Sequence, residues 1–174
     1  QPSYNFIDGG YLKVELDELP LDPTGFFFRG SAEVAENWFV HGGFASADDS
    51  TGFLDVEVDQ FNFGGGYKTG LGENTSLDFS LDYVKAEASA ENRFGYTASA
   101  DEDGYGLGAG IRSMVSDSVE LNAGVDYIDM DTSDGLEFNV GAVWYVTEMF
   151  GILAQAGVDE DSNSQYMIGG RLSF

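Results

Sequence analysis

The sequence predicts an all-β protein, an up-and-down antiparallel barrel of about ten strands, with an eight-stranded barrel as the alternative. Three observations predict this fold. Apolar and polar residues alternate in short segments, turn residues separate these segments, and hardly any stretch has helical spacing. Short connections alternate with longer acidic ones, which is the pattern of an up-and-down barrel with both chain ends on the short-turn side.

The composition fits one folded domain over residues 1–174 and excludes several function classes. The absence of cysteine excludes disulfide scaffolds, zinc knuckles and thiol catalysis. Seven basic against 31 acidic residues give a formal charge of −24, which repels nucleic acid. No apolar run reaches the roughly 20 residues of a membrane-spanning helix. The chain opens without an apolar leader, so we expect any signal peptide to have been removed already.

The first predicted strand lies near Tyr4–Lys13, and its orientation depends on Asp8. A charge facing hydrocarbon is unfavourable, so Asp8 is expected to point inward, with Ile7 and Tyr11 pointing outward. Because other apolar residues of this segment favour the opposite phase, a bulge near Gly9–Gly10 would reconcile the two halves.

Rows of apolar residues at every second position predict the remaining nine strands, each of roughly ten residues. In chain order these rows are Phe26–Val34, Trp38–Phe44, Phe61–Tyr67, Leu77–Tyr83, Tyr105–Ile111, Val119–Tyr127, Leu136–Trp144, Phe150–Val158 and Tyr166–Phe174.

Two kinds of connection separate the predicted strands. The short turns are Ala35–Asn37, Thr69–Asn74, Ser116–Ser118 and Thr147–Met149. The longer, acidic loops are Asp17–Thr24, Ala47–Asp55, Glu87–Asp103, Asp129–Asp134 and Asp159–Ser164. In a membrane barrel, the short turns would be periplasmic and the long loops extracellular.

Alternation alone does not say whether the apolar rows face a core or a lipid bilayer, but the distribution of residues favours a transmembrane barrel. Glycine concentrates on the polar face, as expected for a narrow interior, and charged residues share that face. The predicted lumen charge network is Arg29, Glu33, His41, Asp78, Asp82, Arg112, Glu120, Asp126, Glu137 and Arg171. Aromatic residues gather at the strand ends, as membrane interfaces select. The predicted girdle residues are Trp38, Tyr67, Tyr83, Tyr105, Tyr127, Trp144, Phe150 and Phe174. The alternative is a soluble barrel that binds an apolar ligand inside.

Four segments resemble known outer-membrane proteins. Gln165–Phe174, with alternating apolar residues and a terminal aromatic, resembles the carboxy-terminal signal of Gram-negative outer-membrane proteins. Ser3–Tyr11, Glu36–Phe44 and Val58–Tyr67 resemble the opening, first-turn and fourth-strand motifs of small outer-membrane barrels once proposed as secreted activators of plant immunity, with a general likeness to OmpA- and OmpX-like barrels. The resemblance implies a bacterial outer-membrane location. It also implies contacts with lipid, lipopolysaccharide and, through the last strand, the assembly machinery.

Catalysis is not expected. His41 is the only histidine, and no serine, histidine and acid constellation can be assembled around it. The charged interior is instead expected to form either a hydrogen-bonded plug or a narrow path that favours cations, because excess negative charge attracts them.

The acidic loops have two interpretations. They are either solvated like charges, as a saline habitat would favour, or a binding site for Ca²⁺, which takes several carboxylate oxygens. The candidate ligands are Asp129, Asp131, Asp134, Asp159 and Asp161, although neither run has the spacing of an EF-hand. Calcium would bridge these loops to lipopolysaccharide or to another copy of the chain. The sequence therefore predicts a structural or narrow-pore outer-membrane protein, with an adhesive or lattice-forming surface protein as the alternative.

Overall fold

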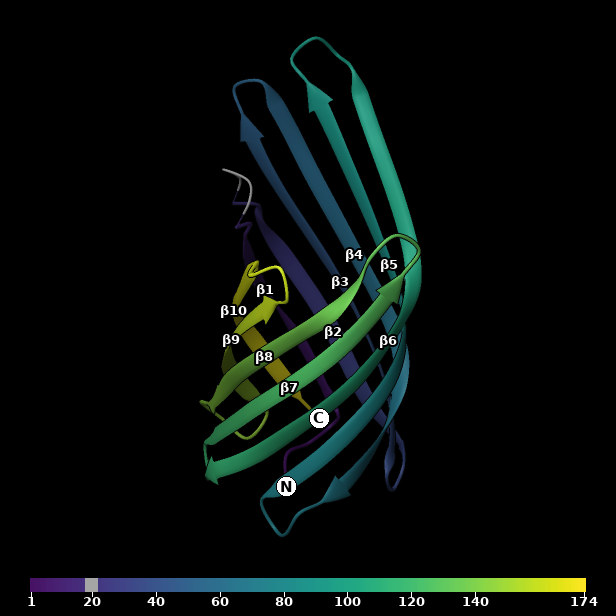
Figure 1. Ribbon diagram of the computed structural model, residues 1–174. Coiled ribbons are helices and arrows are strands. Elements are labelled where there is room, and N and C mark those ends of the chain that lie inside the picture. The colour runs from purple at the N-terminus through teal and green to yellow at the C-terminus, as the bar shows by residue number, and fades with distance from the viewer. Residues whose placement is uncertain (18–21) are drawn as a thin grey trace.

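The computed structural model describes residues 1–17 and 22–174 as a closed barrel of ten antiparallel strands (Figure 1). Every strand pairs with its neighbours in the chain, and β1 closes the barrel against β10. The strands are β1 Phe6–Glu15, β2 Thr24–Ala35, β3 Trp38–Thr51, β4 Leu54–Gly70, β5 Thr75–Asn92, β6 Thr97–Ser116, β7 Val119–Met130, β8 Asp134–Tyr145, β9 Phe150–Asp159 and β10 Ser164–Ser173. The prediction of an up-and-down barrel of ten strands is confirmed, and the eight-stranded alternative is wrong.

The apolar rows point out of the barrel, as the alternation of a membrane barrel requires. Large apolar side chains on every strand are exposed, and β10 is an example, with Tyr166, Ile168 and Leu172 all facing outward. Among the described residues, no helix is long and apolar enough to cross a membrane. The buried side chains, by contrast, include Asp8, Glu120 and Arg171, so a soluble barrel with the apolar rows packed inward is excluded.

The first strand needs no bulge. β1 pairs with β2 and β10 in unbroken register, so the predicted irregularity at Gly9–Gly10 is wrong. Asp8 points inward and is fully buried, while Tyr11 points outward. Phe6 and Leu12 point inward on the same face of β1 as Asp8. Apolar residues therefore occur on both faces of this strand because the interior of the barrel also accepts apolar side chains. The shifts of register fall instead beside two turns, between Glu33 and Ala35 and between Met114 and Ser116.

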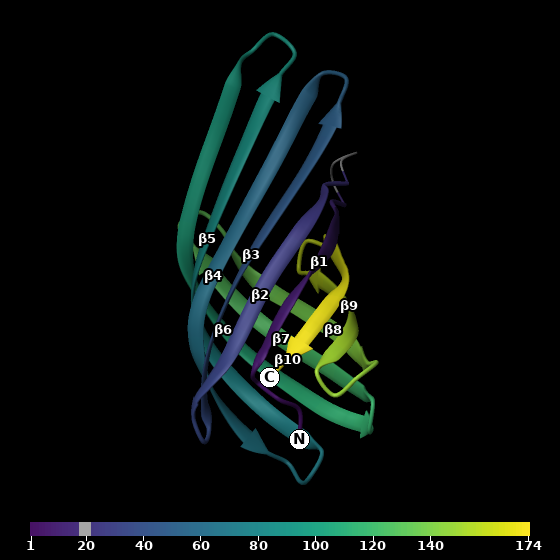
Figure 2. The ribbon, with the colours of Figure 1, turned by 180° about the vertical axis from the view of Figure 1, so that it is seen from behind.

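Two of the predicted acidic loops are strands. Ala47–Asp55 and Glu87–Asp103 form the far ends of two long hairpins, β3–β4 and β5–β6, that project well beyond the rest of the barrel (Figures 1 and 2). The many acidic residues of these segments predicted loops, but the period of two continues through them. Glu87 and Glu91 point outward, while Ala88 and Ala90 lie on the opposite face of β5. Such alternation preserves a strand even in water, where an acidic outer face is fully solvated. Of the three other acidic segments, Asp129–Asp134 and Asp159–Ser164 connect strands, and residues 18–21 of Asp17–Thr24 lie outside the described residues.

A small apolar core lies inside the barrel, where the sequence predicted only polar side chains. Leu12, Phe27 and Ala47 from β1 to β3 pack against Val143 of β8 and Leu153 of β9. Phe27 of this core also lines the lumen cavity, so apolar side chains form part of the cavity wall. The two chain ends lie together at the short-turn side, because the Phe174 amide donates a hydrogen bond to the Asn5 carbonyl.

Candidate functional site: the polar lumen

A buried group of arginines and carboxylates fills part of the lumen near the short-turn end. We call Asp8, Arg29, Arg112, Glu120 and Arg171 the arginine cluster. Arg29 Nε donates to Asp8 Oδ2 at 2.7 Å. Arg171 donates two hydrogen bonds to the same carboxylate, from Nε at 2.8 Å and from Nη2 at 2.9 Å. Asp8 thereby satisfies two guanidinium groups from strands on both sides of its own, which is how a buried carboxylate remains charged.

Glu120 holds the other half of the arginine cluster. Its Oε1 accepts from Arg112 Nε at 2.9 Å and from Arg171 Nη1 at 3.2 Å. The Tyr145 hydroxyl donates to Glu120 Oε2 at 3.0 Å. Glu120 is fully buried, so these contacts replace its hydration. The cluster joins β1, β2, β6, β7 and β10 across the lumen and is nearly neutralised by its own carboxylates.

Aromatic rings close the short-turn side of this cluster. The guanidinium carbon of Arg171 lies 3.9 Å from the centroid of the Phe6 ring, and that of Arg112 lies 4.5 Å from the centroid of the Tyr4 ring. Tyr4 also stacks on Phe39, with ring centroids 4.8 Å apart. Burial and the adjacent Asp78 raise the pKa of the Tyr4 hydroxyl, so this hydroxyl stays a donor. Tyr4, which precedes β1, therefore packs against Phe39 and Arg112 and is buried at the short-turn side of the cavity.

A second group of carboxylates lies on the opposite wall, and we call Asp78, Asp82 and Asp126 the acidic row. Asp78 and Asp82 belong to β5 and share its inward face. Asp126 of β7 lies opposite Gly108 of β6, which in turn lies opposite Ser80 of β5. The register therefore places Asp126 midway between the levels of Asp78 and Asp82 along the lumen.

The acidic row is not paired with basic side chains. Within residues 1–17 and 22–174, none of its carboxylates forms an ion pair with a lysine or arginine. Its hydrogen-bond donors are neutral: the Tyr4 hydroxyl to Asp78 at 2.7 Å, Asn62 Nδ2 to Asp82 at 3.5 Å and Asn139 Nδ2 to Asp126 at 3.0 Å. His41 Nε2 lies 3.2 Å from Asp82 Oδ1. Apart from His41, the carboxylates of this wall thus have no basic neighbour within ion-pair distance in the part of the chain that the structure describes.

Glycines of β6 let these carboxylates lie flat against the wall. A Cβ added at Gly108 would lie 2.5 Å from Ser80 Oγ and 2.6 Å from Asp126 Oδ1. One added at Gly110 would lie 2.8 Å from Asp78 Oδ1. The backbone at both positions is ordinary strand, so glycine leaves room for these side chains against the wall, and an added methyl group would displace them. This explains why glycine concentrates on the lumen face of the sequence.

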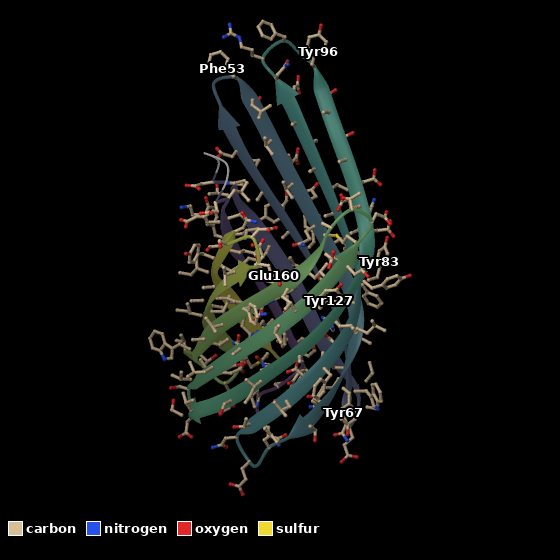
Figure 3. All side chains as sticks on the ribbon, viewed as in Figure 1. Phe53, Tyr67, Tyr83, Tyr96, Tyr127 and Glu160 are labelled. Atoms are coloured by element: carbon tan, nitrogen blue, oxygen red, sulfur yellow. The ribbon has the colours of Figure 1, made fainter. Side chains whose placement is uncertain are left out.

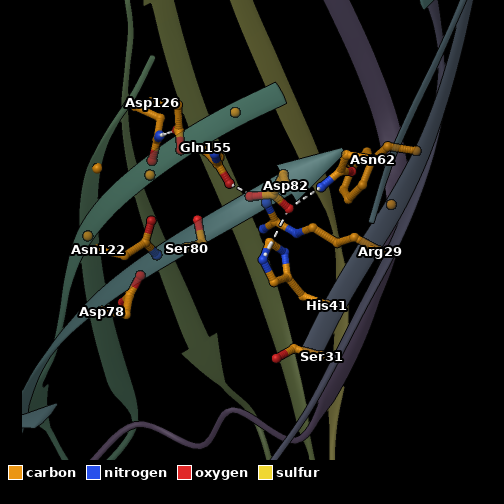
Figure 4. A pocket seen from close by; sticks show the side chains of 18 of the residues that line it. Arg29, Ser31, His41, Asn62, Asp78, Ser80, Asp82, Asn122, Asp126 and Gln155 are labelled. Carbon is orange, nitrogen blue, oxygen red and sulfur yellow. Dashed lines mark hydrogen bonds and ion pairs between the residues drawn. The ribbon is translucent and has the colours of Figure 1, made fainter. Parts of the chain in front are cut away.

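The acidic row and Arg29 line a common cavity of about 380 Å³ (Figure 4). The cavity continues along the lumen, toward the long-hairpin end, to Gln60, Val84 and Ile128. Ser31 of β2 also lines it, and the Ser31 side-chain oxygen is buried without a hydrogen-bond partner. The cavity therefore has a mixed apolar and polar lining, with carboxylates gathered on one wall.

The structure separates the predicted lumen network into distinct groups. Arg29, Arg112, Glu120 and Arg171 come together around Asp8, whereas Asp78, Asp82 and Asp126 form the acidic row with His41 beside Asp82. Glu33 lies apart from both and pairs with Lys68 Nζ at 2.6 Å near the short turns. Glu137 is half-buried on β8, opposite Asp126 in the β7–β8 register. Sequence reasoning missed Tyr4, Tyr145 and Gln155, which carry no charge and gave no signal.

The predicted girdle residues all project outward from the barrel and are exposed. Tyr83 and Tyr127 lie on an upper level and Tyr67 on a lower one, while Phe53 and Tyr96 lie at the tips of the long hairpins (Figure 3). The Trp38 and Tyr67 rings meet edge to face, with centroids 5.2 Å apart. The aromatic side chains thus occupy two levels that flank the aliphatic band.

The predicted calcium ligands are spread over separate loops. Asp129 lies opposite Asp134 in the β7–β8 register, and Asp159 accepts hydrogen bonds from Asn163 within its own loop. In the described part of the chain, no group of three or more carboxylate or histidine side chains is placed to hold a metal ion.

Comparison with known proteins gives a family and several similar folds. Residues 3–145 match the family described as outer membrane protein beta-barrel domain. The crystal structure of Ail, the attachment invasion locus protein of Yersinia pestis, is 18% identical, with a TM-score of 0.54 over 99% of this chain and 100% of Ail. The translocator domain of the autotransporter NalP from Neisseria meningitidis is 12% identical, with a TM-score of 0.56 over 100% of this chain and 90% of that one.

The KdgM porin, solved in complex with disordered oligogalacturonate, is also 12% identical with a TM-score of 0.56, over 97% of this chain and 99% of KdgM. No curated protein matches the sequence. At these identities, the likeness to solved structures establishes the fold alone.

Proposed function

Because the chain belongs to the outer membrane protein beta-barrel domain family, a bacterial outer-membrane barrel, we propose that its lumen is a narrow path that favours cations. The single observation that carries this proposal is the acidic row, which lines the cavity with no lysine or arginine partner among the described residues and with only His41 beside Asp82. Rings of carboxylates attract cations and repel anions.

The balance of charge in the lumen supports the same sign of selectivity. Carboxylates outnumber arginines, and the arginines are already engaged by Asp8 and Glu120. A cation that enters from the long-hairpin side therefore meets the acidic row without meeting a free guanidinium. The arginine cluster and Tyr4 narrow the short-turn side, so conductance is expected to be small.

Single-channel recording in a planar bilayer tests this proposal. In a salt gradient, the wild-type barrel should give small steps with a reversal potential of the cation-selective sign. Asp82→Asn and Asp126→Asn should move that potential toward zero, whereas Asp161→Asn, which removes the same charge from an exposed loop, should leave it unchanged. Large anion-selective steps would contradict the proposal.

A second function, as an adhesive or lattice-forming surface protein, is favoured by the projecting β3–β4 and β5–β6 hairpins. Their tips expose Phe53, Phe94 and Tyr96, and Arg93 lies 5.1 Å from the centroid of the Phe53 ring. Native mass measured in mild detergent with and without Ca²⁺ tests this function. A mass that rises with Ca²⁺ supports calcium-bridged assembly of the acidic outer faces, and an unchanged monomer in both conditions argues against it.

The family places the protein among lipids of the outer membrane. Contacts with lipopolysaccharide and, through β10, with the assembly machinery are part of the same proposal. No catalytic role is proposed for His41, which lies against Asp82 and Phe39 inside the lumen.

A further inference from the structure

We propose that the acidic row binds a short protonated diamine in the lumen, with its two ammonium groups on successive carboxylates. This inference deepens the proposed function and rests on it, because the solute must enter the path from the long-hairpin side. The evidence comes from charge, spacing, available space and an unused polar group.

The lumen requires cations that the chain itself does not supply. Buried or half-buried carboxylates are normally paired with a positive group. Asp8 and Glu120 obey this rule, whereas Asp78 and Asp126 receive only neutral donors in the described structure. The arginines that line the cavity are already engaged: Arg29 by Asp8 and by Gln155 Oε1 at 2.8 Å, and Arg112 and Arg171 by Glu120. A solute cation is therefore the missing partner of the acidic row.

The spacing of the row suits a cation with two charged ends. Asp78 and Asp82 are four residues apart on one strand, about 13 Å, and Asp126 lies halfway between their levels. Asp126 and Asp78 lean over Gly108 and Gly110, two successive lumen-facing glycines of β6, so their carboxylates lie on the order of 6–7 Å apart along that strand. A four-carbon diamine separates its nitrogens by about 6 Å, from ordinary bond lengths. A single metal ion does not span this spacing, and no group of three or more acidic side chains in the described residues is placed to hold one.

The wall beneath the row is hollowed by glycine. Because Asp126 leans over Gly108 toward Ser80, the carboxylate lies against the backbone and leaves the cavity in front of it open. A methyl group at Gly108 would meet both Ser80 Oγ and Asp126 Oδ1. Gly106, two residues before Gly108 on the same face of β6, has room for a methyl group, since the nearest atom to an added Cβ would be Val84 Cγ2 at 3.5 Å.

Ser31 provides the independent sign of a ligand. Its side chain is only 7% exposed, it lines the same cavity, and its hydroxyl has no hydrogen-bond partner (Figure 4). A buried hydroxyl without a partner is uncommon and calls for an explanation. An amine that enters the cavity brings N–H donors that this hydroxyl accepts.

Titration calorimetry of the folded barrel in detergent tests the proposal with 1,4-diaminobutane, butylamine and 1,4-butanediol. The diamine should bind, butylamine should bind about tenfold more weakly because it keeps one ammonium contact, and the diol should not bind. Asp126→Asn should weaken diamine binding about tenfold, and the loop control Asp161→Asn should not. Heat-modifiable gel mobility verifies that each variant is folded.

A pair of glycine variants separates a built site from general attraction to an acidic protein. Gly108→Ala, which leaves every charge in place, should weaken the diamine about tenfold, whereas Gly106→Ala should leave its affinity unchanged. Equal binding of diamine and butylamine, or equal effects of Asp126→Asn and Asp161→Asn, overturns the inference. If binding is absent while the bilayer steps remain cation-selective, the inference fails and the proposed function stands. If the diamine binds but the bilayer recordings show no cation-selective steps, the proposed cation path is refuted and the diamine site stands.

Discussion

Replacing Asp8 with asparagine probes the arginine cluster directly. The change preserves the shape of the side chain but removes the charge that holds two guanidinium groups, at 2.7 Å from Arg29 and at 2.8 and 2.9 Å from Arg171. Asp8 is fully buried, so water does not replace the lost contact. Removing one partner of a buried ion pair typically costs about 3–5 kcal/mol. We expect the Asp8→Asn barrel to lose about that much free energy of unfolding.

Urea titration in lipid vesicles measures the loss, with unfolding followed by gel mobility and by the fluorescence of Trp38 and Trp144. Asp161→Asn, at an exposed loop position, is the control for charge removal and should change the free energy of unfolding by less than about 0.5 kcal/mol. Adding Arg29→Met to Asp8→Asn should recover part of the loss, because one uncompensated cation is then removed. An Asp8→Asn barrel as stable as the control would refute the idea that this cluster holds the lumen together.

Three other predictions test separate parts of the structure. Ile168→Arg, on the lipid-facing side of β10, should reduce the folding free energy in vesicles by about 2–4 kcal/mol, and an unchanged value would place this face away from lipid. Tyr145→Phe removes the hydrogen bond to Glu120 and should lower the free energy of unfolding by about 1–3 kcal/mol in the same urea assay. An unchanged free energy of unfolding would show that this bond does not stabilise the barrel. Trypsin added to proteoliposomes should cleave the protein after Arg93, at the exposed tip of the β5–β6 hairpin, and resistance of this site to cleavage would argue against a projecting tip.

Much of the strand pattern could be predicted from the sequence, because side chains along a strand alternate between its two faces with a strict period of two. The outward side of each strand, from Phe26 to Ile168, follows directly from it, and so does the inward position of Asp8. Ala47–Asp55 and Glu87–Asp103 were misassigned as loops because their acidic composition outweighed a weak alternation of alanine and acid. The bulge at Gly9–Gly10 was a wrong prediction for a related reason, since a purely polar interior was assumed and Leu12 did not fit it.

The candidate site was only partly accessible to sequence reasoning. Charged residues at alternating positions identify which side chains enter the lumen, but not which of them meet. The grouping of Arg171 of β10 with Glu120 of β7 depends on how the closed barrel brings opposite walls together, and alternation contains no information on distance across the lumen. The hydroxyls of Tyr4 and Tyr145 joined the network for the same reason.

By itself, the sequence determined the all-β class and which residues share a face of each strand, and it favoured about ten strands with their apolar rows in lipid, because these follow from a local repeat and from the cost of charge in hydrocarbon. Only the tertiary structure decided that Asp8 and Glu120 neutralise the arginines, while Asp78, Asp82 and Asp126 have no lysine or arginine partner among the described residues and His41 lies beside Asp82. The physical reason is that local alternation fixes direction, whereas pairing across a closed barrel depends on register and curvature over the whole chain.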